Sequence, residues 1–379
     1  MIADSGAAVM ARRARRRDRR VYLASHPVIF GLLVATRGRQ VTKLGRTVLV
    51  QSADAFIESL TRLPLDRTAD RTTGGLAREF VADGVLFDQD GQAHRDKRRS
   101  FAADLSTAGV DRLRPIWHEV LGRRLAALGA GGTVDMTDVT AELAGATVCA
   151  LLDIDADPLA VARAAADVAA AAAHAHLPGI RPFGANRRLA ARTGELLHVV
   201  GAERPDVAGA AAMLAVAAVN TTVAGIPRAV AWCADCGLWP QAARDEQREV
   251  LTAELLRVTA ATGVLPRVAA ADGTVGGRQV RTGDRLLLVA RHAAGAHRRG
   301  PDCDRPAEPR VAQLVFGAGT HACPGAALAR AQLSDTLAML APYEPVVVGA
   351  RADRRSALPG WKSLTVRATT AVPSSCSGS

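Results

Sequence analysis

The ten-residue segment 316–325, FGAGTHACPG, constrains the fold of this chain more than any other part of the sequence. Three glycines and a proline surround Cys323, and AALARAQL, a segment of helix-favouring residues, follows at once. Glycine has no side chain, so it allows a backbone to approach a large flat group or to adopt a positive φ angle. The segment therefore predicts a loop made for close approach, with Cys323 just before a helix.

Cys323 has three possible roles: a buried structural thiol, a nucleophile whose pKa the helix N-terminus lowers, or a metal ligand. A nucleophile needs a base. His321 lies two residues away in a turn, and His292 and His297 have no spacing that favours them. The glycines favour the ligand, because backbone N–H groups in such a loop can stabilise a thiolate. One protein sulfur with open space opposite is the arrangement of thiolate-ligated haem.

The segment FGAGTHACPGAALAR resembles the cysteine-loop signature of the cytochrome P450 family, Phe-Gly-x-Gly-x-His/Arg-x-Cys-x-Gly. This resemblance implies a mainly α fold with a small β region, and haem b (iron protoporphyrin IX) with Cys323 as iron ligand. It extends from about residue 27 to residue 370, and residues 150–210 align poorly. The residues at the signature positions are Phe316, Gly317, Gly319, His321, Cys323 and Gly325.

A second family signature, Glu-x-x-Arg, occurs as Glu254 and Arg257 in AELLRV. At a spacing of three residues, both side chains lie on one face of a helix. In the family this pair is buried with a downstream arginine and braces the cysteine loop. Arg305 is the predicted third member, and Arg310 is the rival candidate.

Haem propionates are anions and need cationic or N–H donors. The resemblance assigns this role to His94 and Arg98, which share one helical face in HRDKR, to Arg267 in LPRVAA, and to His321. The family often has a further histidine three residues before the signature phenylalanine. Gln313 stands there, which predicts one weaker contact.

The distal-helix signature is present in altered form. The family pattern is Ala/Gly-Gly-x-Asp/Glu-Thr-Thr, and this chain reads AAVNTT over residues 217–222. In the family, the threonine orders water on the oxygen-binding side of the haem, and the neighbouring acid relays protons. Thr221 and Thr222 keep the hydroxyls, but Asn220 cannot release and regain a proton as a carboxyl group does. Proton delivery is therefore predicted to follow another route or to be altered.

Composition predicts a globular protein with a substantial core, because 49% of the 379 residues are hydrophobic and 22% are charged. The net charge is +11, of which ARRARRRDRR and its flanks give residues 1–20 a share of +5. Such an arm can meet nucleic acid or anionic lipid, but the prediction is a disordered leader. The predicted organisation is a basic arm over 1–20, one haem domain over 21–370 and a flexible tail over 371–379.

The segment VIFGLLVA follows the arginines, but no small-residue cleavage site follows it. It is also far shorter than the roughly 20 residues that span a bilayer. We therefore expect a cytoplasmic protein without a membrane span. The six cysteines predict no disulfide framework. Cys233 and Cys236 form one CxxC in a helical segment, and buried core thiols are favoured over a redox or zinc site.

Apolar residues at three- and four-residue spacing predict that most of the chain is helical. A strand hairpin is predicted over 40–52 and a strand pair over 280–290, whereas 64–90 and 291–313 read as mostly irregular and the C-terminal segment has weak strand character. The predicted helices span residues 26–38, 53–63, 94–105, 109–128, 139–154, 156–177, 207–230, 249–260 and 325–340.

The resemblance implies a monomeric P450 monooxygenase that oxidises a small organic substrate with O₂, in secondary-metabolite biosynthesis. No reductase segment is evident, so electrons are expected from a separate ferredoxin and ferredoxin reductase. Two alternatives stay open. One is a haem-thiolate enzyme of other chemistry, such as peroxide-driven oxidation, coupling, rearrangement or dehydration, which Asn220 motivates. The other is a non-catalytic haem-binding or nucleic-acid-binding protein, although no nucleic-acid partner is expected.

Overall fold

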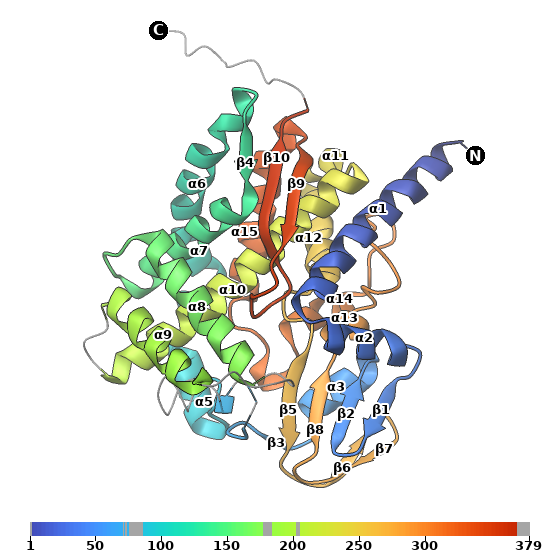
Figure 1. Ribbon diagram of the computed structural model, residues 1–379, viewed down its shortest axis with the longest axis vertical. Coiled ribbons are helices and arrows are strands. Elements are labelled where there is room, and N and C mark those ends of the chain that lie inside the picture. Colours follow the sequence, from blue (N-terminus) through green and yellow to red (C-terminus); the bar gives the residue numbers. More distant parts are fainter. Residues whose placement is uncertain are drawn as a thin grey trace.

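A computed structural model describes residues 2–70, 72, 74–75, 86–176, 184–201 and 205–369. Helices make up most of it, and the strands lie in two places, with the larger sheet at the lower right and a second sheet in the upper middle (Figure 1). One helical group consists of α6 (Thr107–Gly129), α7 (Met136–Leu152), α8 (Pro158–His176) and α9 (Ala185–Val199). The mainly α class with a small β region, predicted from the sequence, is confirmed.

The larger sheet has the strand order β1-β2-β8-β5-β3. The hairpin of β1 (Val41–Leu44) and β2 (Thr47–Val50) confirms the first strand prediction. The predicted strand pair over 280–290 is wrong. β7 (Arg278–Val280) pairs with β6 (Gly273–Val275), whereas β8 (Arg285–Leu288) lies between β2 and β5 (Leu265–Ala269). β8 takes this inner position because Leu286 and Leu288 are fully buried.

The remaining strands complete the β region. The short strand β3 (Leu65–Asp66) forms the other edge of the larger sheet, next to β5. A second sheet has the order β4-β10-β9, with β4 (Thr133–Asp135), β9 (Val346–Ala352) and β10 (Trp361–Arg367) all antiparallel. The weak strand character predicted for the C-terminal segment is thus confirmed.

The helix α10 (Pro205–Cys236) runs through the middle of the molecule (Figure 1). It packs against α7, α8 and α12 (Asp245–Thr259), and its segment Gly209–Cys236 is long and apolar enough to cross a membrane. Half of that segment is buried inside the fold. Its apolar composition is therefore that of a core helix, which a folded protein needs at its centre.

Most of the predicted helices are confirmed, including α2 (Pro27–Thr36), α3 (Ala53–Thr61), α5 (Gly91–Ser100) and α15 (Ala326–Leu340). The segment 291–313, read as irregular, contains the end of α13 (Ala290–Ala293) and all of α14 (Pro309–Ala312). Short helices also occur at α11 (Trp239–Ala242), η1 (Gln313–Phe316), η2 (Gly319–His321) and η3 (Ala341–Tyr343). The predicted tail over 371–379 and much of 64–90 lie outside the described residues.

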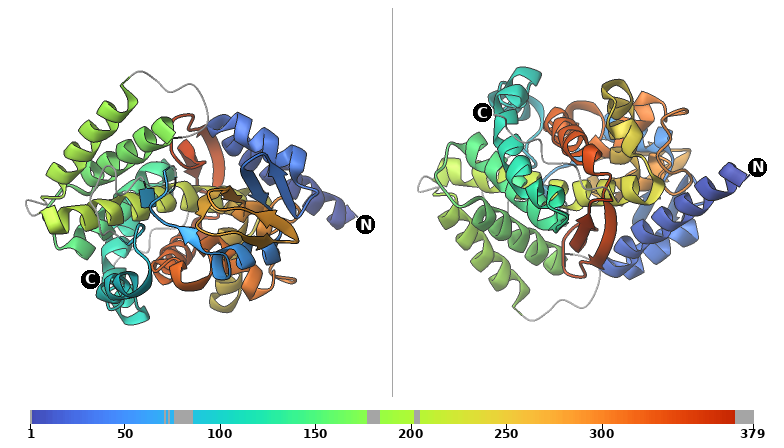
Figure 2. Two further views of the ribbon diagram at one scale, coloured as in Figure 1. Left: turned by 90° about the horizontal axis from the view of Figure 1, so that it is seen from below. Right: turned by 90° about the horizontal axis from the view of Figure 1, so that it is seen from above.

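The expectation of a disordered basic arm is corrected by the structure. Residues 2–25 form the helix α1 (Ile2–Ser25), which packs along α10 (Figure 2). Ala14, Val21 and Tyr22 are buried on its inner face, at the spacing of helical turns. Asp18 lies among them and accepts hydrogen bonds from Nε and Nη2 of the buried Arg228 at 2.9 and 2.7 Å. The arginine run therefore belongs to a helix whose other face is anchored in the core.

Candidate active site

The cysteine loop is held in one shape by glycines and backbone hydrogen bonds. Gly317 and Gly319 have φ angles of 80° and 72°, which side-chain-bearing residues rarely adopt. A Cβ atom on Gly319 would also lie 3.2 Å from the carbonyl oxygen of Leu60. The Cys323 N–H donates to the Phe316 carbonyl at 2.7 Å and closes the loop. The loop then enters α15, as the sequence predicts.

The Cys323 side chain is exposed, yet the surrounding protein raises the pKa of its thiol through burial. The Gly325 N–H and the cations Arg98 and Arg330 act in the opposite direction and favour the thiolate. A bound metal displaces the thiol proton outright, so this environment suits a metal ligand better than a free nucleophile. His321 makes no hydrogen bond to Cys323 in the part of the chain that the structure describes.

Three predicted propionate ligands gather beside the loop. His94 is buried on α5, and its ring packs on that of His321 with 3.9 Å between centroids. Arg98, also on α5, donates from Nη1 to the carbonyl oxygen of Ala322 at 2.6 Å. Burial lowers the pKa of His94, and it lowers the pKa of His321 to about 4. Both imidazoles are therefore neutral N–H donors at pH 7, while Arg98 supplies a positive charge.

Arg267 on β5 is a half-buried cation that no carboxylate pairs with among the described residues. Its Nη1 donates to the adjacent Pro266 carbonyl at 2.7 Å, and its Nε has no hydrogen-bond partner. Burial, followed by the charge of Arg67, lowers the pKa of Arg267 to about 9. A buried guanidinium without an anion is strongly destabilising. The position therefore fits an anionic group.

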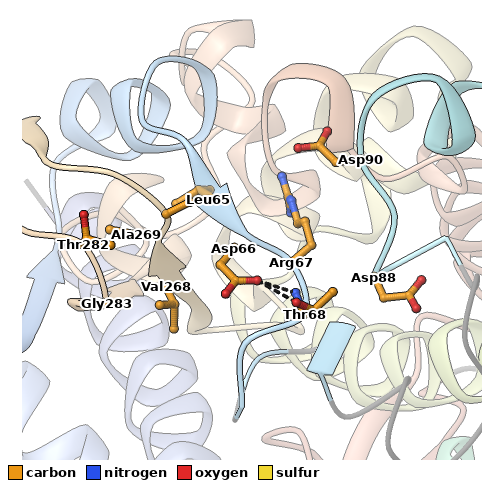
Figure 3. Close-up of a pocket in the computed structure, with 11 residues that line it drawn as sticks. Leu65, Asp66, Arg67, Thr68, Asp88, Asp90, Val268, Ala269, Thr282 and Gly283 are labelled. Carbon is orange, nitrogen blue, oxygen red and sulfur yellow. Dashed lines mark hydrogen bonds between the residues drawn. The ribbon is translucent and has the colours of Figure 1, made fainter.

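Arg67 is a site residue that the sequence did not reveal. Its Nε also lacks a hydrogen-bond partner, and burial lowers its pKa, an effect that Asp90 offsets only in part. It lines a cavity of about 410 Å³ (Figure 3), where its side chain points toward Asp90. Its charge also lowers the pKa values of Arg267, His94 and His321. Arg67 thus links the two groups of predicted propionate ligands. Its segment carries no sequence periodicity that could have singled it out.

On α10, the residues of the altered signature point in different directions. Thr221 is exposed in the middle of this core helix, and its Oγ1 donates to the Ala217 carbonyl at 2.9 Å. Asn220 donates from Nδ2 to the carbonyls of Ala165 on α8, at 3.2 Å, and of Val216, at 2.7 Å. Thr222 is half-buried beside them. Asn220 therefore fastens α10 to α8, and Thr221 presents the accessible hydroxyl.

Glu254 and Arg257 on α12 form a buried ion pair, and each side chain is 1% exposed. Arg257 donates from Nε and Nη2 to the two Glu254 oxygens at 2.8 and 2.6 Å. Glu254 also accepts from the backbone N–H groups of Asp302 and Ala307 at 3.2 and 2.9 Å. The pair thus holds the segment that leads through α14 and η1 to the cysteine loop.

The prediction that Arg305 is the third member of this cluster is wrong. Its side chain is 86% exposed and lies near Asp302, and the rival Arg310 is an exposed residue paired with Glu308 and Asp54. Arg299 takes the place instead, with Nη2 3.8 Å from Glu254 Oε2. The segment around Arg305 contributes its backbone N–H groups to Glu254, so its side chains turn outward.

The CxxC of the sequence has the properties of core thiols. Cys233 is buried, and burial raises its pKa well above the usual range, while it raises the pKa of Cys236 to about 12. Both therefore stay protonated at neutral pH, which disfavours redox chemistry. In the part of the chain that the structure describes, no group of three or more His, Cys, Asp or Glu side chains is placed to hold a metal ion.

No protein-family model and no curated protein matches this chain. Solved structures do match it. A mutant of P450 EryK with erythromycin B is 19% identical, with 91% of this chain and 97% of that chain covered and a TM-score of 0.73. EryK comes from S. erythraea. P450BioI in complex with an acyl carrier protein ligated to hexadec-9Z-enoic acid is 17% identical, with 92% and 99% covered and a TM-score of 0.74.

A third match is the mycinamicin VIII C21 methyl hydroxylase MycCI from Micromonospora griseorubida, bound to mycinamicin VIII. It is 21% identical, with 88% of this chain and 95% of that chain covered and a TM-score of 0.69. The chain therefore has the fold of the bacterial cytochromes P450, as its cysteine loop predicts.

Proposed function

We propose that this protein is a cytochrome P450 monooxygenase that binds haem b, with Cys323 as the axial ligand of the iron. The observation that carries this proposal is the position of Cys323, on a glycine-restrained loop in a P450 fold that also holds Arg67 and Arg267, two half-buried arginines whose Nε atoms have no hydrogen-bond partner. When bound, the haem would supply activation of O₂, so that one oxygen atom enters a small organic substrate. Two electrons would come from a separate ferredoxin and ferredoxin reductase.

The residues present fit this cofactor. A porphyrin with two propionates brings an iron that accepts one thiolate and anions that accept N–H donors. Cys323 offers the thiolate just before α15, and Gly325 leaves the sulfur uncrowded, because a Cβ atom there would lie 3.9 Å from Sγ. Arg330 lies over the Phe316 ring, with 4.8 Å between its Cζ and the ring centroid, and keeps that ring in place. The donors for the propionates would be Arg67, His94, Arg98, Arg267 and His321.

The change Arg267→Gln, made alone or together with Arg67→Gln, is expected to raise the stability of the haem-free protein and to lower its affinity for haem. The haem-free form should become more stable, because a half-buried charge without a carboxylate partner among the described residues is removed. Haem affinity should fall by about 10- to 100-fold for the single variant, since one charge-assisted hydrogen bond contributes about 1.5–3 kcal/mol. Thermal unfolding and haem titration, followed by Soret absorbance, measure the two effects. Arg305→Gln, on an exposed side chain, is the control. Unchanged haem affinity in the double variant would refute this assignment.

Thr221 would hold water on the substrate side of the haem and pass protons through its hydroxyl. Its Oγ1 already donates to Ala217, so its lone pairs remain available to accept from water. Asn220 cannot relay a proton and is bonded to α8, so its part in the reaction would be to position α10. Protons would reach Thr221 through water and not through a neighbouring acid.

Thr221→Val keeps the shape of the side chain and removes the hydroxyl. We expect product formation per NADPH consumed to fall by about 10- to 100-fold, in the range of a lost acid–base group. Asn220→Asp should instead lower the stability, because a carboxylate cannot donate to the Ala165 carbonyl. Product yield and unfolding midpoints in matched preparations separate these outcomes. If Thr221→Val formed as much product per NADPH consumed as the unchanged protein, the proposed proton route would be wrong.

A second candidate function is a haem-thiolate enzyme of other chemistry, such as peroxide-driven oxidation or oxidative coupling. The engaged Asn220 amide favours it, because Asn220 and not an acid precedes Thr221 in the chain. Comparing turnover with ferredoxin, reductase and NADPH against turnover with H₂O₂ distinguishes the two functions. The monooxygenase should turn over efficiently only with the electron donors.

For the substrate, we infer a natural product made in secondary metabolism. EryK is solved with erythromycin B and MycCI with mycinamicin VIII, and both support this class. P450BioI is solved with an acyl carrier protein, so a substrate tethered to a carrier belongs in the same screen. Soret shifts of the haem-loaded protein with macrolides, fatty acids and acyl carrier conjugates measure binding. The enzyme is expected to act as a cytoplasmic monomer.

A further inference from the structure

Exposed hydrophobic side chains are concentrated at the N-terminal end of the molecule. Nine large hydrophobic side chains are exposed among the described residues, and six of them belong to α1 and α2. Two others lie in β9, a strand that packs against α1. These eight are Val9, Met10, Leu23, Val28, Leu32, Val34, Val346 and Val348. A cluster of this kind on a folded protein marks an interaction surface.

The positive charge is concentrated at the same place. The first 46 residues contain eleven lysines and arginines and two aspartates, so they carry nine of the eleven net positive charges. On the outer face of α1, Arg12, Arg16, Arg19 and Arg20 are exposed, and none of them is paired with a carboxylate in the part of the chain that the structure describes. They recur at helical spacing together with Val9 and Leu23.

The helix α2 has no polar face. Its sequence, PVIFGLLVAT, contains no charged residue. Phe30 and Leu33 are buried against the sheet region, but Val28 is 81% exposed and Leu32 is 40% exposed on the other side. A helix on the surface of a globular protein normally turns polar side chains to water. The outer side of α2 therefore exposes apolar side chains where a surface helix normally has polar ones.

We propose that α1 and α2 together form a surface that binds an anionic phospholipid bilayer from one side, without crossing it. The two helices are consecutive, pack against each other and run along the outside of the molecule (Figures 1 and 2). Aliphatic side chains of α2 enter the boundary between headgroups and acyl chains, and the α1 guanidinium groups bind lipid phosphates. This combination of a basic face with exposed aliphatic residues is that of interfacial membrane helices.

Charge and hydrophobicity together favour lipid over nucleic acid. Phosphates of either partner would attract the four arginines. A nucleic acid would leave Val28 and Leu32 in contact with water or polar backbone, whereas a bilayer buries them. The proposal goes beyond the proposed enzymatic function and does not depend on it, because lipid binding can be measured with or without haem.

The test is co-sedimentation of the full chain with vesicles of phosphatidylcholine alone and of an equal mixture with phosphatidylglycerol. We expect binding to the mixed vesicles to be at least about tenfold tighter, and to weaken as salt is added. The quadruple change Arg12→Gln, Arg16→Gln, Arg19→Gln and Arg20→Gln should lose at least about tenfold in affinity. Val28→Ser with Leu32→Ser should also weaken binding, although the charge stays the same.

The matched control removes four exposed arginines on α6, α8 and α9, at the opposite side of the molecule in Figure 1, and should bind as the unchanged protein does. Its substitutions are Arg112→Gln, Arg163→Gln, Arg187→Gln and Arg188→Gln. Circular dichroism and thermal unfolding check that each variant is folded. Equal affinity for both vesicle types, or an equal loss in the control, overturns the proposal. So does binding to duplex DNA that is tighter than lipid binding and unaffected by the Val28 and Leu32 changes.

Discussion

The variant Cys323→Ala, loaded with haem, is expected to lose both the thiolate-type ferric absorption spectrum and all turnover above that of free haem. The sulfur is the axial group that we assign in the loop: the loop backbone is closed by the Cys323 N–H bond to Phe316, and the next residues enter α15. Cys233 cannot replace it, because it is buried elsewhere in the core. Alanine keeps the loop geometry and removes only the ligand.

Cys236→Ala is the control for this experiment. Its thiol is held protonated, with a pKa raised to about 12, so its removal should leave spectrum and turnover unchanged. Absorption spectra and product formation are measured on both variants at equal haem content. If Cys323→Ala kept the thiolate spectrum, or if Cys236→Ala lost it, the ligand assignment would be wrong.

Glu254→Gln is expected to lower the free energy of unfolding by about 3–5 kcal/mol, as for a buried ion pair that loses one partner. The carboxylate accepts from Arg257 and from the backbone of Asp302 and Ala307. An amide leaves the Arg257 charge uncompensated and turns one acceptor into a donor. Because this segment leads to the cysteine loop, haem incorporation should fall as well.

Urea unfolding of the haem-free protein and haem content after reconstitution measure the two losses. Adding Arg257→Leu to Glu254→Gln should recover part of the stability, since no buried charge then remains. Arg305→Ala should change stability by no more than about 0.5 kcal/mol, as for exposed residues in general. If Arg305→Ala lowered the free energy of unfolding by a large amount and Glu254→Gln by a small one, Arg305 and not Arg299 would be the third member of the cluster.

The parts of the molecule that could be predicted are those with local signals. The helices α6, α7, α12 and α15 follow apolar periodicity, and the cysteine loop follows from glycine and from the helix after it. The Glu254–Arg257 contact was predictable because both residues lie on one helical turn. Each of these features depends on residues that are close in the sequence.

The features that were missed depend on residues far apart in the sequence. β8 pairs in parallel with β2, which precedes it by more than 200 residues, and no local pattern reports such a partner. Asp18 anchors α1 through Arg228, so a run of arginines that reads as solvated has one buried face. Arg67 and Arg299 join their clusters through folding alone, and a single arginine in an irregular segment gives no signal.

Thiolate ligation of haem by Cys323 underlies the proposed function, and the ferrous–CO spectrum of the freshly reconstituted protein tests it. The protein is loaded with haem, reduced and exposed to carbon monoxide. We predict the red-shifted Soret band of a cysteine-thiolate complex, and its loss in Cys323→Ala. A protein that takes up no haem, or whose fresh ferrous–CO complex lacks that band, would show that the account of this site is wrong.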